Sequence, residues 1–353
     1  MPKKVLIGMS GGVDSSVSAL LLKKQGYEVI GATMKLYEPN CNQNATCGTS
    51  KAIEDAKKIC EILEIPHYVI DNTKEFNEKV INHFINEYSN ARTPNPCIEC
   101  NKYLKFGEFY KKALELNCDY IATGHYAKVE YSEKYKSYIM KKSDCIKKDQ
   151  TYFLYGINKE VLPKLLFPLE NIPDKEKVRE IARQNKLVVA EKTDSQEICF
   201  IPDDDYNRFL CKYLKPQKGN IVLRDGTVLG SHNGLANYTV GQRKGLGIAY
   251  KEPLYVLKLN NNTNEVIVGP EKELYSKELY ANELNYLLDI NLYNPIDINA
   301  KVRYRAKEAK AILYPPKNGI SKIEFEEPQR AITPGQSVVF YIGDTVLGGG
   351  KII

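Results

Sequence analysis

Two groups of residues have types and spacings that could do chemistry: a glycine-rich loop and a set of cysteines. The loop is Ser10-Gly11-Gly12-Val13-Asp14-Ser15, which directly follows a short apolar run. Adjacent glycines let backbone N–H groups turn toward phosphate oxygens, and the N-terminus of a following helix adds partial positive charge. The hydroxyls of Ser10, Ser15 and Ser16 are further donors. The loop therefore predicts a nucleotide site.

Asp14 has two candidate roles in this loop. It could cap the following helix, or it could help to hold Mg²⁺ beside the phosphates. No Gly-Lys-Ser/Thr follows the glycines, so the loop is not a Walker loop. The alternative is a tight strand-to-helix turn without a ligand, but the full Ser-Gly-Gly-x-Asp-Ser pattern after a strand favours the nucleotide.

Nine cysteines are present, and three of them stand out. Cys97 and Cys100 form a C-x-x-C pair after two prolines, at a predicted helix start. Such a position lowers the pKa of a thiol toward the reactive thiolate. Cys199 lies about a hundred residues further on. The other six are expected to be small core or loop residues: Cys41, Cys47, Cys60, Cys118, Cys145 and Cys211.

The C-x-x-C pair alone is compatible with half a zinc site, a redox pair or two unrelated thiols. A zinc finger would need a second ligand pair, and the four histidines fall in no ligand pattern. Together with Cys199, the pair could also hold a [4Fe–4S] cluster with one iron left open.

The elements that must position these residues alternate between strand and helix. Apolar β-branched runs predict strands at residues 5–9, 27–33, 67–71 and 119–124. Helical patterns end at about Gln25 and cover about 51–63, 73–88 and 102–116. This alternation predicts an α/β fold with a doubly wound parallel sheet, whose ligands bind at the carboxyl ends of the strands.

Beyond residue 200 the pattern changes to β-structure. Residues 221–229 form two short apolar runs around Asp225-Gly226, a hairpin signal. From about Glu271, short alternating strands separated by Pro, Gly and Asn predict a small β-barrel or sandwich. We therefore predict an α/β domain with the nucleotide loop at 1–200, a central linker domain at 201–269 and a β-barrel domain at 270–353.

The bulk composition sets broad limits. A chain of 353 residues with 43% hydrophobic residues can form two or three domains. The net charge of +6 is a weak indication of a nucleic-acid partner. No apolar stretch reaches the roughly 18 residues that span a bilayer, and no leader pattern precedes the first strand. We therefore expect a cytoplasmic protein with reduced thiols.

The nucleotide loop resembles that of the PP-loop ATP-pyrophosphatases, which cleave ATP to AMP and pyrophosphate and adenylate a carbonyl oxygen. The ordered motifs along the whole chain resemble the tRNA-specific 2-thiouridylase family. These motifs are residues 8–15, 93–102, 124–127, 148–154, 195–201, 238–247, 333–341 and 347–350.

The resemblance implies a reaction. With ATP and Mg²⁺, the enzyme would adenylate C2 of uridine 34 in the Lys, Glu and Gln tRNAs. Persulfide sulfur would then displace AMP to give 2-thiouridine. Cys199 would carry the persulfide, received from a cysteine desulfurase or a relay protein, and Cys100 would be the nucleophile that frees the sulfur by forming a disulfide. Many family members have Asp where this chain has Cys97, which leaves the role of that thiol open.

The resemblance also implies the binding residues. Those for ATP are Gly8, Met9, Ser10, Gly11, Gly12, Val13, Asp14, Ser15, Met34 and Gly124. Those for tRNA are Asn95, Pro96, Cys97, His125, Lys148, Asp149, Gln150, Tyr304, Arg305 and Gln336.

Two of these RNA contacts depend on local structure. Residues 301–307 alternate cationic and apolar side chains, which predicts a strand with one positive face for an RNA backbone, or else a solvated edge strand protected by charge. Residues 148–150 are predicted to open a helix near the flipped base.

Two other functions remain as alternatives. The chain could be a PP-loop ligase for a small molecule, although such a reaction needs no cysteine. It could also be a non-catalytic tRNA-binding or iron–sulfur carrier protein, although the intact nucleotide loop argues against that.

Overall fold

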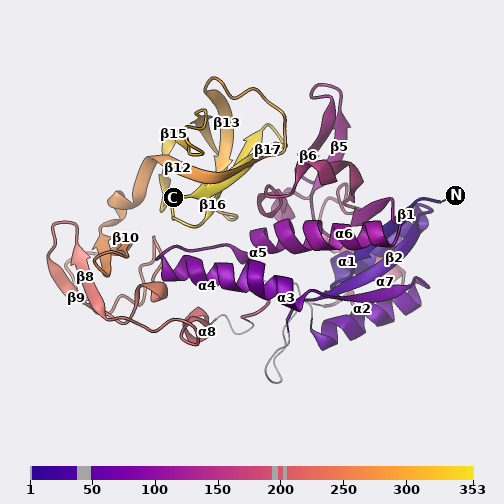
Figure 1. The fold of residues 1–353 in the computed structure, drawn as a ribbon, viewed down its shortest axis with the longest axis horizontal. Coiled ribbons are helices and arrows are strands. Elements are labelled where there is room, and N and C mark those ends of the chain that lie inside the picture. Colours follow the sequence, from indigo (N-terminus) through magenta and orange to yellow (C-terminus); the bar gives the residue numbers. More distant parts are fainter. Residues whose placement is uncertain (1, 38–48, 193–197, 202–204) are drawn as a thin grey trace.

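The computed structural model describes residues 2–37, 49–192, 198–201 and 205–353. Figure 1 shows an α/β unit, a closed barrel beside it and a smaller β unit at the far end of helix α4. Cys41, Cys47 and residues 195–197 of the predicted motif at 195–201 lie outside the described residues. No described helix has the length and apolar character that crossing a membrane requires.

The α/β unit contains the predicted parallel sheet. Its five strands lie in the order β3-β2-β1-β4-β7, and each adjacent pair is parallel. The strands are β1 (Lys4–Gly8), β2 (Glu28–Lys35), β3 (His67–Asp71), β4 (Tyr120–Ala122) and β7 (Leu165–Leu166). The central strand β1 pairs with β2 on one side and β4 on the other, so the strand order reverses there. Open α/β sheets bind ligands at such a switch point.

Helices cover both faces of this sheet. Val5 and Ile7 of β1 face a core that includes helices α1 (Val13–Lys24) and α7 (Lys175–Gln184), whereas Leu6 faces the core of helix α6 (Phe109–Glu115). Successive side chains of a strand point to opposite faces, so an unbroken apolar run is what a sheet covered on both sides requires. Helix α2 (Ser50–Ile62) packs near β2 and β3.

Two of the predicted helices are longer or less regular than expected. The helix at 73–88 consists of α3 (Thr73–Phe76), a π-helical segment η1 (Asn77–Ile81) and α4 (Asn82–Ser89). The helix predicted from residue 102 begins earlier, as α5 (Pro96–Glu99), the π-helical η2 (Cys100–Glu108) and α6. The side chain of Asn95 accepts the Cys97 N–H at 3.2 Å, and Pro96 is well suited to a first helical turn, so the helix begins before the thiols.

The central β unit is a four-stranded sheet in the order β10-β11-β8-β9. Strands β8 (Gly219–Leu223) and β9 (Val228–His232) form the hairpin predicted around Asp225-Gly226, where Gly226 has a φ of +89°. Strands β10 (Tyr255–Asn260) and β11 (Glu265–Gly269) complete the sheet, and α8 (Tyr206–Leu210) precedes it.

The C-terminal strands close into a six-stranded antiparallel barrel. The strands are β12 (Tyr275–Tyr286), β13 (Ile296–Lys301), β14 (Ala309–Leu313), β15 (Ser321–Arg330), β16 (Ser337–Ile342) and β17 (Thr345–Ile352). Pairing of β12 with both β15 and β17 closes the ring, so the prediction of a barrel is confirmed and a sandwich is excluded. The hairpin of β5 (Lys128–Ser132) and β6 (Ser137–Lys141) leaves the α/β unit and joins β17 through the pair Thr345 and Lys141.

Two local predictions are wrong. The strand expected at 301–307 ends at Lys301, and turns follow. The reason is that the Arg303 guanidinium turns inward and donates to the carbonyls of Val240 and Ala331 and to the Thr333 hydroxyl. The helix expected to open at 148–150 is absent: two short 3₁₀ turns, Ile146–Lys148 and Thr151–Phe153, lie on either side of Asp149 and Gln150.

Candidate active site

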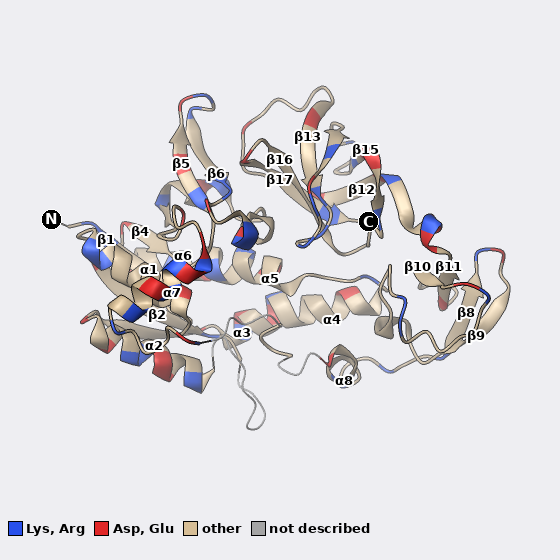
Figure 2. Cartoon of the chain, turned by 180° about the vertical axis from the view of Figure 1, so that it is seen from behind, with Lys and Arg blue, Asp and Glu red and all other residues tan. Residues whose placement is uncertain are grey.

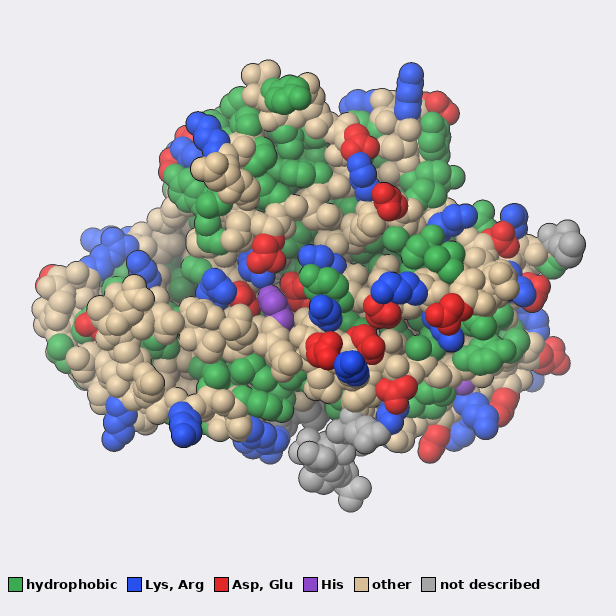
Figure 3. All heavy atoms as spheres, in the orientation of Figure 1, with side chains coloured by type: hydrophobic (Ala, Val, Ile, Leu, Met, Phe, Trp, Pro, Cys, Tyr) green, Lys and Arg blue, Asp and Glu red, His purple; other side chains and the backbone are tan. Residues whose placement is uncertain are grey.

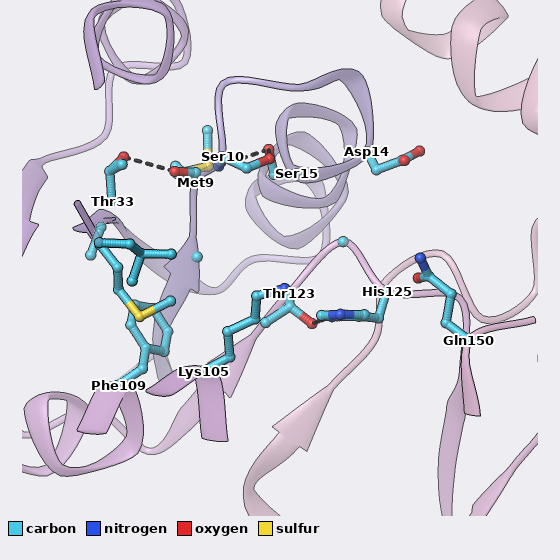
Figure 4. Close-up of a pocket in the computed structure, with 15 residues that line it drawn as sticks. Met9, Ser10, Asp14, Ser15, Thr33, Lys105, Phe109, Thr123, His125 and Gln150 are labelled. Atoms are coloured by element: carbon cyan, nitrogen blue, oxygen red, sulfur yellow. Dashed lines mark hydrogen bonds between the residues drawn. The ribbon is translucent and has the colours of Figure 1, made fainter. Parts of the chain in front are cut away.

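A cavity of about 180 Å³ lies at the carboxyl ends of β1, β2 and β4, where the fold predicts a ligand (Figure 4). The nucleotide loop (residues 10–15) forms one wall, the ends of β2 and helix α6 form another, and residues 123–125 form the floor. The lining residues are Gly8, Met9, Ser10, Asp14, Ser15, Ala32, Thr33, Met34, Leu36, Lys105, Phe109, Thr123, Gly124, His125 and Gln150.

Hydroxyls and glycines shape the nucleotide loop. The Ser15 hydroxyl donates to the Gly12 carbonyl at 3.1 Å and lies 3.2 Å from the Ser10 N–H and hydroxyl. Gly11 has a φ of +69°, and a Cβ there would lie 2.7 Å from the Ala52 carbonyl oxygen. A Cβ on Gly124 would lie 2.8 Å from the Ser15 nitrogen. The loop is therefore closed against its neighbours, and these positions leave no room for a side chain.

Asp14 does not cap helix α1, because the N-cap is Gly12 without a side-chain bond, so that candidate role is wrong. Its carboxylate instead accepts the Tyr126 hydroxyl at 2.8 Å and the Lys175 ammonium at 2.7 Å. Lys175 is the first residue of α7. Both carboxylate oxygens of Asp14 thus have a partner within the protein, and each keeps a second lone pair that is available to Mg²⁺ beside Lys175.

A second lysine holds the loop from outside. Lys192 donates to the Gly11 carbonyl at 2.9 Å and to the Asp55 carboxylate at 2.8 Å. Neither lysine, nor Asp55 nor Tyr126, was predicted from the sequence. Tyr126 lies within the motif at 124–127, but no role was predicted for it. The other three lie in no predicted motif and come from segments up to about 180 residues away, so no local signal identified their contacts.

The β2 side of the cavity contains a polar residue and an apolar wall. The Thr33 hydroxyl donates to the Met9 carbonyl at 2.7 Å and lies 2.9 Å from the His67 Nε2. Burial, with help from nearby Lys57, lowers the pKa of His67. Met34, Leu36 and Phe109 supply the apolar surface. Thr33 was missed, although a polar residue at the carboxyl end of a parallel strand is a usable signal.

His125 lines the nucleotide cavity. Its Nδ1 lies 2.7 Å from the Thr123 hydroxyl, and its ring packs against Phe106 and Phe167. Burial and the nearby charge of Lys105 lower the pKa of His125 well below its usual value, so the ring is neutral at pH 7. Gln150 also lines the cavity and accepts the Tyr126 N–H at 3.0 Å, which links this wall to residues 148–150.

Cys100 and Cys199 belong to one apolar cluster, although they lie far apart in the sequence. Cys100 is buried in the cluster and Cys199 packs against it half-buried, among Leu36, Leu104 and Phe200. The described cysteines form no disulfide, so a resting disulfide bond is not supported. Cys97 is exposed and lies outside the cluster.

The other described cysteines fit the expected minor roles. Burial raises the pKa of Cys60 to about 12 and also raises the pKa values of Cys118 and Cys145, which keeps these thiols protonated. Cys211 is exposed.

The three thiols do not fit an iron–sulfur cluster in this conformation. Over the described ranges, no three His, Cys, Asp or Glu residues gather as metal ligands. Cys97 is exposed whereas Cys100 is buried in the apolar cluster, so the three thiols do not line one common site in this conformation.

The residues predicted to contact tRNA are placed in different settings. Asp149 is buried and accepts the Thr151 hydroxyl at 2.6 Å, and burial raises its pKa. Tyr304 is half-buried with its ring 4.4 Å from that of Phe153, whereas Arg305 is exposed. Gln336 donates to the Thr93 carbonyl at 2.8 Å, next to the thiols. Asp149 and Gln336 thus have partners within the protein.

Charge on the surface is mixed. In Figure 3, basic and acidic side chains are interspersed on the face shown and do not form one broad basic patch. Figure 2 shows positive residues on the β5–β6 hairpin and on the segment after β13. The predicted strand-like positive face at 301–307 is therefore replaced by a turn in which Arg305 and Lys307 are exposed and Arg303 points inward.

Comparisons with known proteins agree with this arrangement. Three family models match in order: "tRNA methyl transferase HUP domain" at residues 3–203, "tRNA methyl transferase PRC-barrel domain" at 207–270 and "Aminomethyltransferase beta-barrel domain" at 276–352. The tRNA-specific 2-thiouridylase MnmA of Acetivibrio thermocellus is 49% identical, and the alignment covers 99% of each chain. The protein of the same name from Clostridioides difficile is 48% identical over 100% of this chain and 98% of its own. With its PP-loop cavity, its clustered thiols and this likeness over the full length, the chain belongs to the tRNA-specific 2-thiouridylase family.

Proposed function

We propose that this protein is an ATP-dependent tRNA uridine 2-sulfurtransferase that forms 2-thiouridine at position 34 and releases AMP and pyrophosphate. One observation carries the proposal: the nucleotide cavity and the thiol cluster share a wall. Met34 and Leu36 line the cavity and also pack in the apolar cluster of Cys100 and Cys199. An activated base held at this wall has ATP on one side and sulfur on the other.

Adenylation is the work of the nucleotide cavity. Oxygen at C2 of uridine is a poor leaving group, and attack of that oxygen on the α-phosphorus of ATP makes it part of AMP and expels pyrophosphate. The backbone N–H groups of the nucleotide loop and the N-terminus of α1 stabilise the negative charge of the leaving group. Mg²⁺, when bound, would neutralise phosphate charge, with Asp14 as its candidate ligand and Lys175 as a second cation beside the same carboxylate.

In this proposal Cys199 and Cys100 carry out sulfur transfer. The terminal sulfur of a Cys199 persulfide attacks C2, and the C2–O bond breaks as AMP leaves. The Cys100 thiolate then attacks the Sγ of Cys199, which frees the thiocarbonyl sulfur and forms a Cys100–Cys199 disulfide. A two-electron reductant, such as a thiol, must restore both cysteines. The half-buried position of Cys199 suits a donor, either a cysteine desulfurase or a relay protein, that reaches one face of the cluster.

The tRNA set follows the family resemblance: the Lys, Glu and Gln tRNAs, modified in the cytoplasm. Residues Lys148, Gln150, Cys97, Tyr304 and Arg305 are the candidate RNA contacts, and His125 lies close enough to the cavity to contact the flipped base. The description of the first family model names methyl transfer, but a PP-loop and a thiol pair favour adenylation and sulfur transfer.

The test uses purified protein, ATP, tRNA and a persulfide donor. We expect AMP formation that depends on tRNA, and 2-thiouridine at position 34 by nucleoside mass spectrometry. Cys199→Ser should abolish thiolation and still form AMP, whereas Cys211→Ser should leave both unchanged. A small-molecule ligase would form AMP without tRNA, and thiolation by the Cys199→Ser variant would remove the persulfide role. Iron and sulfide assay after anaerobic purification tests the cluster separately.

A further inference from the structure

The turn that leads into β16 lies against the loop that leads to the thiols. We call residues 92–95 the thiol loop. The Gln336 side-chain amide donates to the carbonyls of Thr93 at 2.8 Å and Pro94 at 3.4 Å. In return, the Thr93 N–H donates to the Pro334 carbonyl at 2.9 Å. Two segments about 240 residues apart are thus joined by reciprocal hydrogen bonds.

Gly335 makes this close approach sterically feasible. Its φ is +89°, and a Cβ would lie 2.8 Å from the Thr93 nitrogen and 2.9 Å from the Arg92 Cβ. The turn is itself fixed to the barrel, because the Gly335 N–H donates to the Ile352 carbonyl at 2.9 Å and the Ile352 N–H donates to the Gln336 carbonyl at 2.8 Å. The turn that contacts the thiol loop is therefore held in place by the backbone of the barrel.

The next residue, Ser337, contacts the segment that follows residues 148–150. The Ser337 carbonyl accepts the Tyr152 hydroxyl at 2.9 Å, and its own hydroxyl lies 2.9 Å from that of Tyr155. Both tyrosines are buried, and they lie two and five residues after Gln150. The Asn101 side chain, one residue after Cys100, donates to the Phe153 carbonyl at 3.0 Å. Four consecutive barrel residues, 334–337, thus connect the thiol loop with the segment predicted to lie beside the base.

The position of the thiol loop determines where the helix with Cys97 and Cys100 begins. Pro94 and Pro96 restrict the backbone on both sides of Asn95, which caps the helix that carries Cys97 and Cys100. We infer that Gln336 is a positioning residue for sulfur transfer: from the barrel it fixes the thiol loop, and with it the placement of Cys100. This inference rests on the proposed function, and it assigns the Gln336 amide to the protein rather than to RNA.

The two assignments of Gln336 give different kinetics. Gln336→Met keeps the length of the side chain but removes the donor. If Gln336 positions the thiols, the single-turnover rate of thiolation at saturating tRNA falls at least about tenfold, because small misplacements of reacting groups cost that much or more. The rate of AMP formation and the Kd for tRNA stay within about twofold. If Gln336 instead contacts RNA, the Kd rises and the saturated rate is unchanged, which would overturn the inference.

Matched variants complete the experiment. Gln329→Met, on β15 and away from the site, is the control and should match the wild type. Gln336→Lys retains a donor and should recover part of the thiolation rate. Gly335→Ala should reproduce the Gln336→Met pattern, and its thermal unfolding curve shows whether the variant is folded.

Hydrogen exchange gives a readout that does not need activity. In the full-length protein, the peptide covering the thiol loop should exchange faster in Gln336→Met than in Gln329→Met. The carbonyls of Thr93 and Pro94 lose their donor, so the neighbouring bond from the Thr93 N–H to the Pro334 carbonyl opens more often. Equal exchange in both variants would overturn the inference. A wild type without tRNA-dependent AMP formation would instead contradict the proposed function.

Discussion

The nucleotide loop and the thiol loop both lead into the N-terminus of a helix, but they are held in different ways. The nucleotide loop is shaped by its own glycines and serine hydroxyls, with Gly12 accepting from both Ser15 and Ser16. The thiol loop is held by a barrel turn about 240 residues away. The difference indicates that adenylation depends on a locally encoded motif, whereas sulfur transfer depends on how two parts of the fold meet.

The largest expected effect concerns the locally encoded loop. Gly11→Ala should lower the rate of AMP formation about a hundredfold, because Gly11 has φ +69° and its Cβ would lie 2.7 Å from the Ala52 carbonyl. Gly226→Ala is the matched control, since Gly226 also has a positive φ (+89°) but a Cβ there would meet nothing within 4 Å. Pyrophosphate release in single turnover measures both. Equal losses would show that the loop is not set by this local fit.

A smaller effect is expected at the contact between Asp14 and Lys175. Lys175→Met leaves the Asp14 carboxylate without its cation, next to the phosphates of ATP, and should slow AMP formation about tenfold. Lys177→Met, which removes only a surface pair with Glu180, is the control. If Lys175 served only stability, the melting temperature would fall while the rate of the folded protein stayed unchanged.

The smallest expected effect is a change in the free energy of unfolding at Asp149, in the segment predicted to contact RNA. Burial raises the pKa of Asp149, so its folded-state stabilisation is present at low pH and is lost as pH rises through that raised pKa. Asp149→Asn should therefore increase the free energy of unfolding at pH 7.5 by about 1 kcal/mol. The gain should shrink as the pH falls and the wild-type carboxyl becomes protonated.

Urea unfolding at several pH values measures this difference, and the exposed Asp144→Asn is its control. If the gain in the free energy of unfolding persisted at low pH, it could not come from removing a buried, ionised Asp149 carboxylate. A loss of thiolation in the stabilised variant would show that the buried carboxyl, with Thr151, orients residues 148–150 toward the base.

The sequence predicted what is encoded locally. The nucleotide loop, the parallel sheet and the hairpin at Gly226 follow from patterns of a few residues, and the structure contains all three. The predicted strand at 301–307 failed because Arg303 finds acceptors in other segments, at Val240, Ala331 and Thr333. Alternation of charge cannot reveal such distant partners.

The same limit applies to the candidate site. Gln336 and Lys192 act through contacts across more than 180 residues, and nothing near them in the chain indicates those partners. The resemblance supplied Gln336 as an RNA contact, whereas its amide is already bonded to the thiol loop. The apolar cluster of Cys100 and Cys199 likewise depends on packing among α4, η2 and residues 198–201.

The barrel closure also has a consequence for the order of events on the ribosome. The turn at 334–336 is fixed by Ile352 of β17, and β17 closes the barrel with β12. The α/β unit, including the nucleotide loop, leaves the ribosome well before these residues, and domains tend to fold as they emerge. A nascent chain could therefore bind ATP before its thiol loop is set. On the proposed roles of the thiols, the approach of Cys100 to Cys199 would then be a late event, so an unfinished chain would be poor at releasing sulfur to the base.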